Sequence, residues 1–327
     1  MREYGGFLPI ETGINEYYRE NCGYDIARFN IARYAIAEAV RISGCVKVWV
    51  PLYTCHSVIE SLESQGILYS MYNISENLYP NLVSIADDEI ILITTYFGIK
   101  DATFCSEMTK KYKNVIFDNT QSFYLAPVLK ENVFNVYSPR KFFGVSDGAY
   151  LIALDLSNVG NYELDYSYDR AGFLLSSFEI GTNNVYSDYL KSEEQLNGSG
   201  IRMMSKLTRG LLGSVDYDGV AEIRRKNYMI LAGMLENYNC LAQDCMLPNN
   251  CIPMIYPFLP SDGASLREYL VSNKIYVPQW WKWVLSEKMV SQFEADLSRE
   301  LCPIPIDQRY SEDDMKIIAS VVLEKFK

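Results

Sequence analysis

Histidine is almost absent from this chain, and closely paired cysteines are missing altogether. His56 is the only histidine in 327 residues. This argues against a metal site built on several histidines, and it leaves a Ser-His-Asp triad only if His56 serves it. The eight cysteines are scattered and form no CxxC pair. Because no signal peptide is recognisable either, we expect a cytoplasmic protein with reduced thiols rather than a disulfide framework.

Long apolar runs and an excess of basic residues are also missing. No stretch reaches membrane-spanning length. The chain has 30 Lys and Arg against 41 Asp and Glu, which gives a net charge of −11 and a pI of about 4.8. This balance argues against nonspecific nucleic-acid binding, although a local cluster of Arg or Lys can still bind an anionic substrate.

The first half of the chain does contain an alternation of strand-like and helix-like segments. Strands are predicted over residues 46–50, 67–74, 89–97, 114–118, 133–138 and 149–154, and helices over residues 29–42, 57–65 and 106–113. This alternation indicates an α/β fold whose mostly parallel sheet is covered by helices on both faces. In such sheets, ligands bind beyond the carboxyl ends of the strands.

The second half reads differently. Residues 160–215 are rich in Tyr, Ser, Asn and Gly and predict a long excursion without regular structure. Helices are predicted over residues 215–238, 264–272 and 311–326, the last with Ser311 as its N-cap, and strands over residues 252–258 and 275–277. We therefore expect two domains, a large α/β domain of residues 1–214 and a smaller α+β domain of residues 215–327.

Two polar motifs follow predicted strands. The sequence Val-Ile-Phe-Asp-Asn-Thr-Gln-Ser places Asp118 at a strand end, with Gln121 three residues later. The sequence Asn-Val-Tyr-Ser-Pro-Arg-Lys-Phe-Phe-Gly places Ser138 at another strand end, with Lys141 three residues on. Each residue has an ordinary alternative: Asp118 as a loop cap, Gln121 as a surface amide, and Lys141 as a solvated charge.

Together these groups match the needs of pyridoxal phosphate. A carboxylate such as Asp118 keeps the pyridine nitrogen protonated, and an amine such as Lys141 forms a Schiff base with the aldehyde. The hydroxyl of Ser138 suits the phosphate, and the amide of Gln121 suits the phenolic oxygen. The sequence therefore favours a cofactor-dependent enzyme with Lys141 as its catalytic residue.

Further candidates lie near the other predicted strand ends. Arg33 begins the first long helix, whose backbone N–H groups at Ala32–Tyr34 suit a phosphate, although an ordinary amphipathic helix would look the same. His56 follows a strand and could stack on the cofactor ring, with Tyr53 as a rival, or it could be structural. The Trp280-Trp281-Lys282-Trp283 cluster favours packing or an interface over a ligand pocket.

The chain resembles the DegT/StrS group of fold-type I pyridoxal-phosphate enzymes, mostly nucleotide-sugar aminotransferases. The matching pieces run in family order and span nearly the whole chain: Arg33-Tyr-Ala-Ile36, Val50-Pro-Leu-Tyr-Thr-Cys-His-Ser-Val58, Tyr96-Phe-Gly98, Phe117-Asp-Asn-Thr-Gln121, Ser138-Pro-Arg-Lys141 and Leu301-Cys-Pro-Ile-Pro-Ile-Asp307. The chain departs from the family at the phosphate turn, which reads Ala32-Arg33-Tyr34 instead of Gly-Thr-Ala. The spacing from Ser138 to Lys141 is also shorter than in typical members.

The resemblance implies a fold-type I architecture with a seven-stranded type of sheet and pyridoxal 5'-phosphate as cofactor. It implies a homodimeric aminotransferase that moves an amino group from glutamate to a nucleotide-linked keto sugar for cell-surface polysaccharides. Tyr53 and Tyr96 would then contact substrate. One branch of the family replaces the lysine by histidine and dehydrates its substrate, so the presence of Lys141 favours transamination. A dehydratase, other carbon–nitrogen chemistry, or a non-catalytic protein of this fold remain the alternatives.

Overall fold

A seven-stranded sheet forms the centre of the computed structural model, which describes residues 4, 6–82, 84–241, 243 and 246–326. The strand order is β1-β7-β6-β5-β4-β2-β3. The strands are β1 (Asp25–Phe29), β2 (Lys47–Pro51), β3 (Tyr69–Tyr72), β4 (Glu89–Thr94), β5 (Val115–Asp118), β6 (Val133–Tyr137) and β7 (Ala149–Ala153). Only β7 runs against its neighbours, since its pairs with β1 and β6 are both antiparallel. The predicted mostly parallel sheet is therefore confirmed.

The two faces of the sheet are covered by different elements. Ile90 and Leu92 of β4 pack with helices α1 (Ala32–Ser43) and α2 (His56–Ser64). The alternate residues Ile91 and Ile93 pack in another core, with α3 (Ala102–Lys111) and with C-terminal elements. Because successive side chains of a strand point to opposite faces, an almost continuous apolar run such as β4 requires cover on both sides. This explains why so apolar a strand lies in the interior of the sheet.

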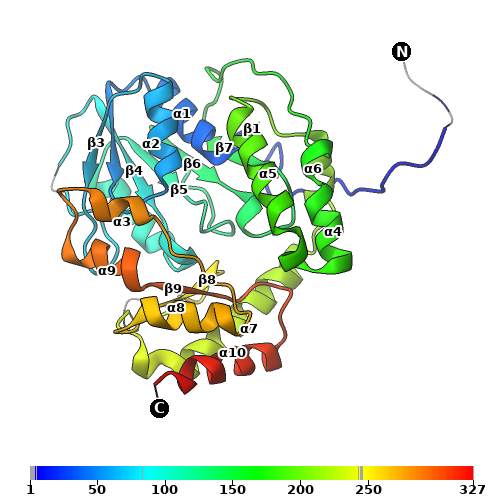
Figure 1. Cartoon of the computed structure of the whole chain (residues 1–327). Helices are drawn as coiled ribbons and strands as arrows, with labels where there is room; N and C mark the ends of the chain where they lie inside the picture. Colours follow the sequence, from blue (N-terminus) through cyan, green and yellow to red (C-terminus); the bar gives the residue numbers. More distant parts are fainter. Residues whose placement is uncertain (1–3, 5, 83, 242, 244–245, 327) are drawn as a thin grey trace.

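The C-terminal elements form a layer at the end of the sheet, in the lower part of Figure 1. They are α7 (Tyr217–Leu235), α8 (Gly263–Ser272), α9 (Gln292–Glu300) and α10 (Glu312–Glu324), with β8 (Ile255–Phe258) antiparallel to β9 (Cys302–Pro305). Ser311 caps α10 in a capping box with Asp314, so its predicted role is confirmed. The predicted boundary at residue 215 lies just before α7, and the division into two domains stays a prediction.

Two predictions of local structure are wrong. Residues 275–277 form no strand. Lys274 has a left-handed φ of 62°, and the backbone N–H of Ile275 donates to the carbonyl oxygen of Leu270 at the end of α8. Residues 160–215 contain three helices, α4 (Gly172–Ile180), α5 (Tyr186–Gly198) and α6 (Lys206–Leu212). No residue of α4 is buried. The helix therefore has no buried apolar face opposite a polar one, and its sequence lacks the amphipathic pattern that predicts a helix. The three helices stand together beside the sheet (Figure 1).

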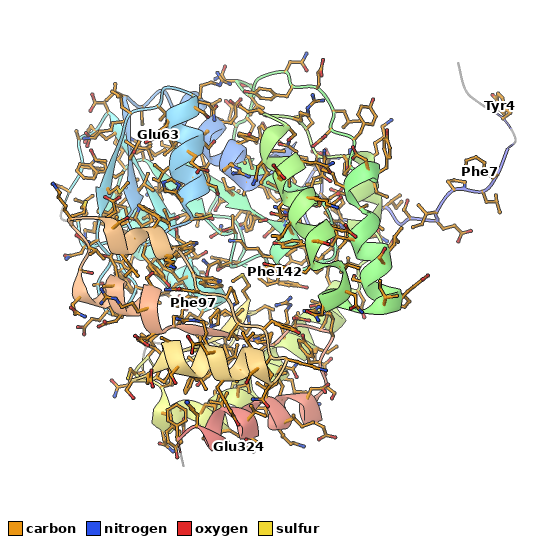
Figure 2. The ribbon with its side chains drawn as sticks, viewed as in Figure 1. Tyr4, Phe7, Glu63, Phe97, Phe142 and Glu324 are labelled. Atoms are coloured by element: carbon orange, nitrogen blue, oxygen red, sulfur yellow. The ribbon has the colours of Figure 1, made fainter. Side chains whose placement is uncertain are left out.

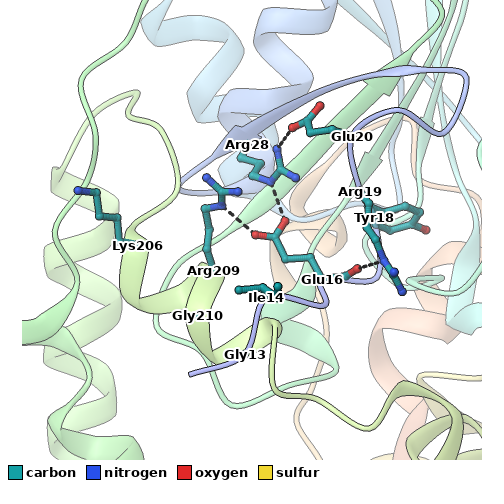
Figure 3. A pocket seen from close by; sticks show the side chains of 10 residues that line it. All are labelled: Gly13, Ile14, Glu16, Tyr18, Arg19, Glu20, Arg28, Lys206, Arg209 and Gly210. Atoms are coloured by element: carbon teal, nitrogen blue, oxygen red, sulfur yellow. Dashed lines mark hydrogen bonds and ion pairs between the residues drawn. The ribbon is translucent and has the colours of Figure 1, made fainter. Parts of the chain in front are cut away.

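The N-terminal segment extends away from the body before it joins the sheet. Figure 2 shows Tyr4 and Phe7 on this segment, far from the rest of the molecule. The segment is held where Glu16 becomes buried between two arginines: its carboxylate lies 2.7 Å from Arg28 Nε and 2.8 Å from Arg209 Nε (Figure 3). These residues border a cavity of about 610 Å³. In the part of the chain that the structure describes, no helix has the length and apolar character to cross a membrane.

Candidate active site

The polar groups of the two sequence motifs converge because their strands are neighbours. β5 pairs in parallel with β4 and with β6, and Asp118 stands beside Thr94 on one side and Val136 on the other. Since the carboxyl ends of parallel strands share one edge, the residues after β4, β5 and β6 meet at that edge. Ser138 follows β6 directly, and Lys141 ends the 3₁₀ turn Pro139–Lys141 that comes next.

Asp118 is a buried carboxylate that retains capacity to accept hydrogen bonds. Its residue is 5% exposed. Oδ1 accepts from the backbone N–H of Thr120 at 3.1 Å, and Oδ2 accepts from the Thr94 hydroxyl at 3.4 Å. Within the described residues no cation forms an ion pair with it at salt-bridge distance. A buried carboxylate held this way suits a protonated ring nitrogen, because a paired charge relieves the cost of burial.

Lys141 projects from the turn after β6 toward the end of β5. Pro139 occupies the first position of this turn, where its missing N–H costs nothing. The Lys141 ammonium donates to Thr120 Oγ1 at 3.1 Å. The side chain is reached by water, yet protein surrounds its amine closely enough that desolvation lowers the pKa of Lys141, against the opposing charge of Asp118. A lowered pKa increases the fraction of neutral, nucleophilic amine.

The start of α1 offers donors for an anion. Ile31 precedes the helix without a side-chain cap. In the described chain no protein group accepts from the backbone N–H of Ala32 or Arg33, whereas Tyr34 N–H bonds to Ile31 O at 3.2 Å. Arg33 Nε and Arg140 Nε are buried without partners among the described residues. Within the described chain, the Ser138 hydroxyl forms no hydrogen bond, so it is available to a ligand. These groups form a cradle of donors suited to a phosphate.

Helix α5 holds both of these arginines from one side. Arg33 bonds to Asn197, and Arg140 forms an ion pair with Glu193. Glu193 and Asn197 are four residues apart, so they lie on the same face of the helix. The two guanidinium groups therefore reach neighbouring positions on α5, and this helix forms a wall of the candidate site.

Gln121 supports the turn after β4. Its Oε1 accepts from the backbone N–H of Phe97 at 2.8 Å, and the residue is fully buried. Phe97 has a φ of 62°, and a Cβ on the next residue, Gly98, would lie 2.7 Å from the carbonyl oxygen of Ile252. Only glycine fits there. The side-chain oxygen of Gln121 is therefore engaged by Phe97. The contact between Gln121 and the cofactor's phenolic oxygen stays a prediction, and the amide nitrogen would have to make it.

Tyr53 and Tyr96 lie in the hydrophobic core rather than on the site surface. The Tyr96 hydroxyl donates to the carbonyl oxygen of Tyr53 at 2.6 Å, and the Tyr53 ring packs edge-on against Trp281 at 4.4 Å. Burial raises the pKa of both phenols well above the usual value. This placement argues against the expected substrate contacts, because neither side chain is accessible.

His56 begins α2 with its ring turned to neighbouring side chains. Nδ1 lies 3.1 Å from Glu60 Oε1, and the ring centroid lies 5.0 Å from that of Trp283. Trp283 Nε1 also donates to the carbonyl oxygen of Thr54 at 2.9 Å. These contacts match the structural alternative for His56. The neighbouring Cys55, not His56, is the residue of this turn that lies close enough to influence the pKa of Lys141.

Sequence reasoning missed Thr120, Cys55 and Arg140 as residues close to Lys141. Thr120 and Arg140 both lie inside the two motifs, so their place in the sequence was a usable signal. Cys55 lies inside the Pro-x-x-Thr turn segment. The packing of the tryptophan cluster was expected and is found: Trp280 stacks on Phe97 with the ring centroids 6.0 Å apart.

Comparison with solved structures identifies the fold. The sugar aminotransferase CalS13 from Micromonospora echinospora superimposes with a TM-score of 0.64 at 12% identity, covering 91% of this chain and 87% of its own. A DegT DnrJ EryC1 StrS aminotransferase from Brucella abortus gives 0.62 at 14% identity, covering 94% and 87%. DesV from S. venezuelae, solved with a ketimine intermediate, gives 0.65 at 15% identity, covering 92% and 84%.

No protein-family model and no curated protein matches the sequence. At 12–15% identity the solved structures establish the architecture along nine-tenths of this chain. They agree with the resemblance seen in the sequence motifs and confirm the expected fold class. The chain therefore shares the fold of these three solved structures.

Proposed function

We propose that this chain is a pyridoxal-phosphate-dependent aminotransferase acting on a keto sugar. The observation that carries the proposal is the convergence of Asp118 and Lys141 at the ends of β5 and β6, beside the donor cradle at the start of α1. The residues present fit the cofactor: a buried carboxylate without a salt-bridge partner in the described chain, an amine of lowered pKa, and orphaned donors for a phosphate.

Each group has one task in this proposal. Bound pyridoxal phosphate supplies an aldehyde to carry the amino group and a ring to take up electrons. Asp118 would hold the proton on the ring nitrogen. Lys141 would hold the cofactor through its Nζ, which condenses with the aldehyde with loss of water, and would carry a proton at that atom. Ser138, the Arg33 guanidinium and the N–H groups of Ala32 and Arg33 would bind the phosphate.

The substrates and setting are part of the same proposal. The neighbours of known structure include sugar aminotransferases, which supports a sugar as the acceptor. The resemblance of the sequence motifs carries the finer part of the proposal: a nucleotide-linked keto sugar destined for a surface polysaccharide as the acceptor, and glutamate as the donor. The described cysteines are all free, which supports a reducing compartment such as the cytoplasm. The exposed apolar residues of α4 support a homodimer.

Borohydride reduction tests the covalent role of Lys141. The chain is incubated with pyridoxal phosphate, reduced, digested and examined by mass spectrometry. We expect the pyridoxyl label on Lys141 and on no other lysine, and we expect the Lys141→Arg variant to lose it. Lys130, an exposed lysine whose ammonium donates to the Thr109 carbonyl oxygen, is the internal control. A label spread equally over both lysines would refute the proposal.

The amino-transfer step has its own readout. Adding glutamate to the loaded chain should change the absorbance of the bound cofactor, and a suitable keto sugar should restore it. A spectrum that never responds to any amino donor would instead favour a non-catalytic protein of this fold.

A further inference from the structure

Thr120 touches both groups that the proposed reaction depends on. Its backbone N–H donates to Asp118 Oδ1 at 3.1 Å, and its hydroxyl accepts from Lys141 Nζ at 3.1 Å. The side chain is 5% exposed. Among the described residues, no other one hydrogen-bonds to both the acid and the lysine. Thr120 is therefore the direct link between β5 and the turn that carries Lys141.

The segment around Thr120 is fixed on two sides, so its hydroxyl has a defined position. Asn119 N–H bonds to the carbonyl oxygen of Val136 in β6 at 2.8 Å, and Asn119 Oδ1 accepts from the Thr95 hydroxyl at 3.0 Å. The Ser122 hydroxyl donates to the Thr95 carbonyl oxygen at 2.7 Å. Threonine is also stiff at χ1 because its Cβ is branched. These contacts preorganise the hydroxyl before any ligand binds.

We propose that Thr120 is a positioning residue that receives the Lys141 amine whenever this amine is not bonded to the cofactor. The proposal rests on the proposed function and deepens it. In the proposed reaction the amine would be displaced by the amino group of the donor, would carry a proton at its Nζ while it is free, and would displace the aminated product at the end. A fixed acceptor at 3.1 Å keeps the amine directed into the site, which limits the loss of orientation that costs rate. Thr120 makes and breaks no covalent bond.

An alternative role for Thr120 is purely structural: the residue shapes the turn and its hydroxyl has no bearing on Lys141. The two roles differ in their effect on the amine's protonation. A hydroxyl that accepts from an ammonium favours the charged form. Three other charged or titratable groups act on this amine: Asp118 on β5, Cys55 before α2, and Arg140 on the same turn. All three remain unchanged when only Thr120 is substituted.

The test measures the protonation of Lys141 in the chain without cofactor. Acetic anhydride labels amines in their neutral form, so the extent of Lys141 labelling across a pH series gives its pKa, with Lys130 as reference. We expect Thr120→Val, which keeps the shape and removes the hydroxyl, to lower the pKa of Lys141 by about one unit. Thr120→Ser, which keeps the hydroxyl, should stay close to the parent chain.

Thr120→Ala guards against a steric effect of the valine methyl, and it should match Thr120→Val. Circular dichroism checks that each variant is folded. In the loaded enzyme, Thr120→Val should reduce kcat about tenfold or more while KM stays unchanged, and Thr120→Ser should restore most of kcat.

The outcomes separate this proposal from the function on which it rests. If both hydroxyl-free variants titrate like the parent while the pyridoxyl label still falls on Lys141, the positioning role is wrong and the proposed function stands. If no cofactor bonds to Lys141 in any chain, the proposed function is wrong and the positioning role is overturned with it.

Discussion

At the scale of single residues, the burial of Asp118 predicts a large effect of a nearly isosteric change. Asp118→Asn keeps one oxygen that can accept from Thr120 N–H, and its amide nitrogen can donate to the Thr94 hydroxyl, which accepts in its place, so the fold should survive. The neutral amide cannot hold the proton on a ring nitrogen. We expect kcat to fall by a factor on the order of 10²–10³, with the midpoint of thermal unfolding almost unchanged. Turnover near that of the parent chain would rule out the role.

Glu16 predicts an effect on stability rather than on activity. Its carboxylate is 6% exposed and pairs with both Arg28 and Arg209 (Figure 3). Arg28 keeps Glu20 as a partner and Arg209 is half exposed, so Glu16→Ala should lower the free energy of unfolding by about 1.5–3 kcal/mol, measured by urea denaturation.

The neighbouring Glu20 provides the matched control for Glu16. It pairs with the same Arg28, but its side chain is 58% exposed. Solvent therefore screens the pair, and Glu20→Ala should cost about 1 kcal/mol or less. Equal losses in the two variants would show that burial of Glu16 is not what matters.

The sequence predicts that Asp118 and Lys141 lie at the same edge of the sheet, because Asp118 ends one apolar strand and Lys141 lies in the turn that follows the next. The sequence could not predict that Tyr53 and Tyr96 lie in the core, because the sequence around a tyrosine does not show whether its ring lines a pocket or packs beneath a tryptophan. Nor could it separate Cys55 from His56, because which of two adjacent side chains faces the site depends on where α2 begins.

At the scale of elements, α5 is tied to the site by its contacts with Arg33 and Arg140. Only Ser192 and Leu196 of this helix are buried, so polar contacts contribute a large share of its attachment. Glu193→Ala should weaken the attachment by about 1 kcal/mol and speed amide hydrogen exchange in α5 roughly fivefold, without changing exchange in β5.

Glu194 is the control for this experiment. It is the next residue of the same helix, but it is exposed. Glu194→Ala should leave the exchange rates of α5 unchanged. If both variants exchange alike, the Arg140–Glu193 pair does not hold the helix.

The elements that sequence reasoning found and those it missed differ in burial. β4, β5 and β6 are fully or almost fully buried, so their apolar runs stand out. α4 buries none of its residues and α5 only two, which removes the period of 3.6 that marks a helix. The false strand at residues 275–277 arose because Val277 is a core residue of irregular backbone.

At the scale of the whole molecule, α4 predicts self-association. Its residues Leu175, Phe178 and Ile180 are 68%, 93% and 55% exposed, and large apolar side chains gathered on one helix mark a contact surface. We expect light scattering to show a dimer at micromolar concentration. Phe178→Asp should weaken that dimer at least tenfold, because it replaces an aromatic ring that dimer formation would bury by a charged side chain.

Leu154 is the control for the contact surface. It is 49% exposed and lies at the end of β7, outside α4. Leu154→Asp should leave the dimer intact. A parent chain that stays monomeric at these concentrations would contradict both the homodimer and the role assigned to α4.

The pairing of β1 with β7 has a consequence for the order of events during synthesis. Phe29 and Ala149 are partners about 120 residues apart, and ribosomes add about 5–20 residues per second. The first strand of the chain therefore waits roughly 6 to 24 s before its partner has been made. Meanwhile β4, β5 and β6, whose parallel partners are closer in the chain, can assemble first. Closing the sheet edge with its earliest strand becomes a late step, slowed by the long loop it must close.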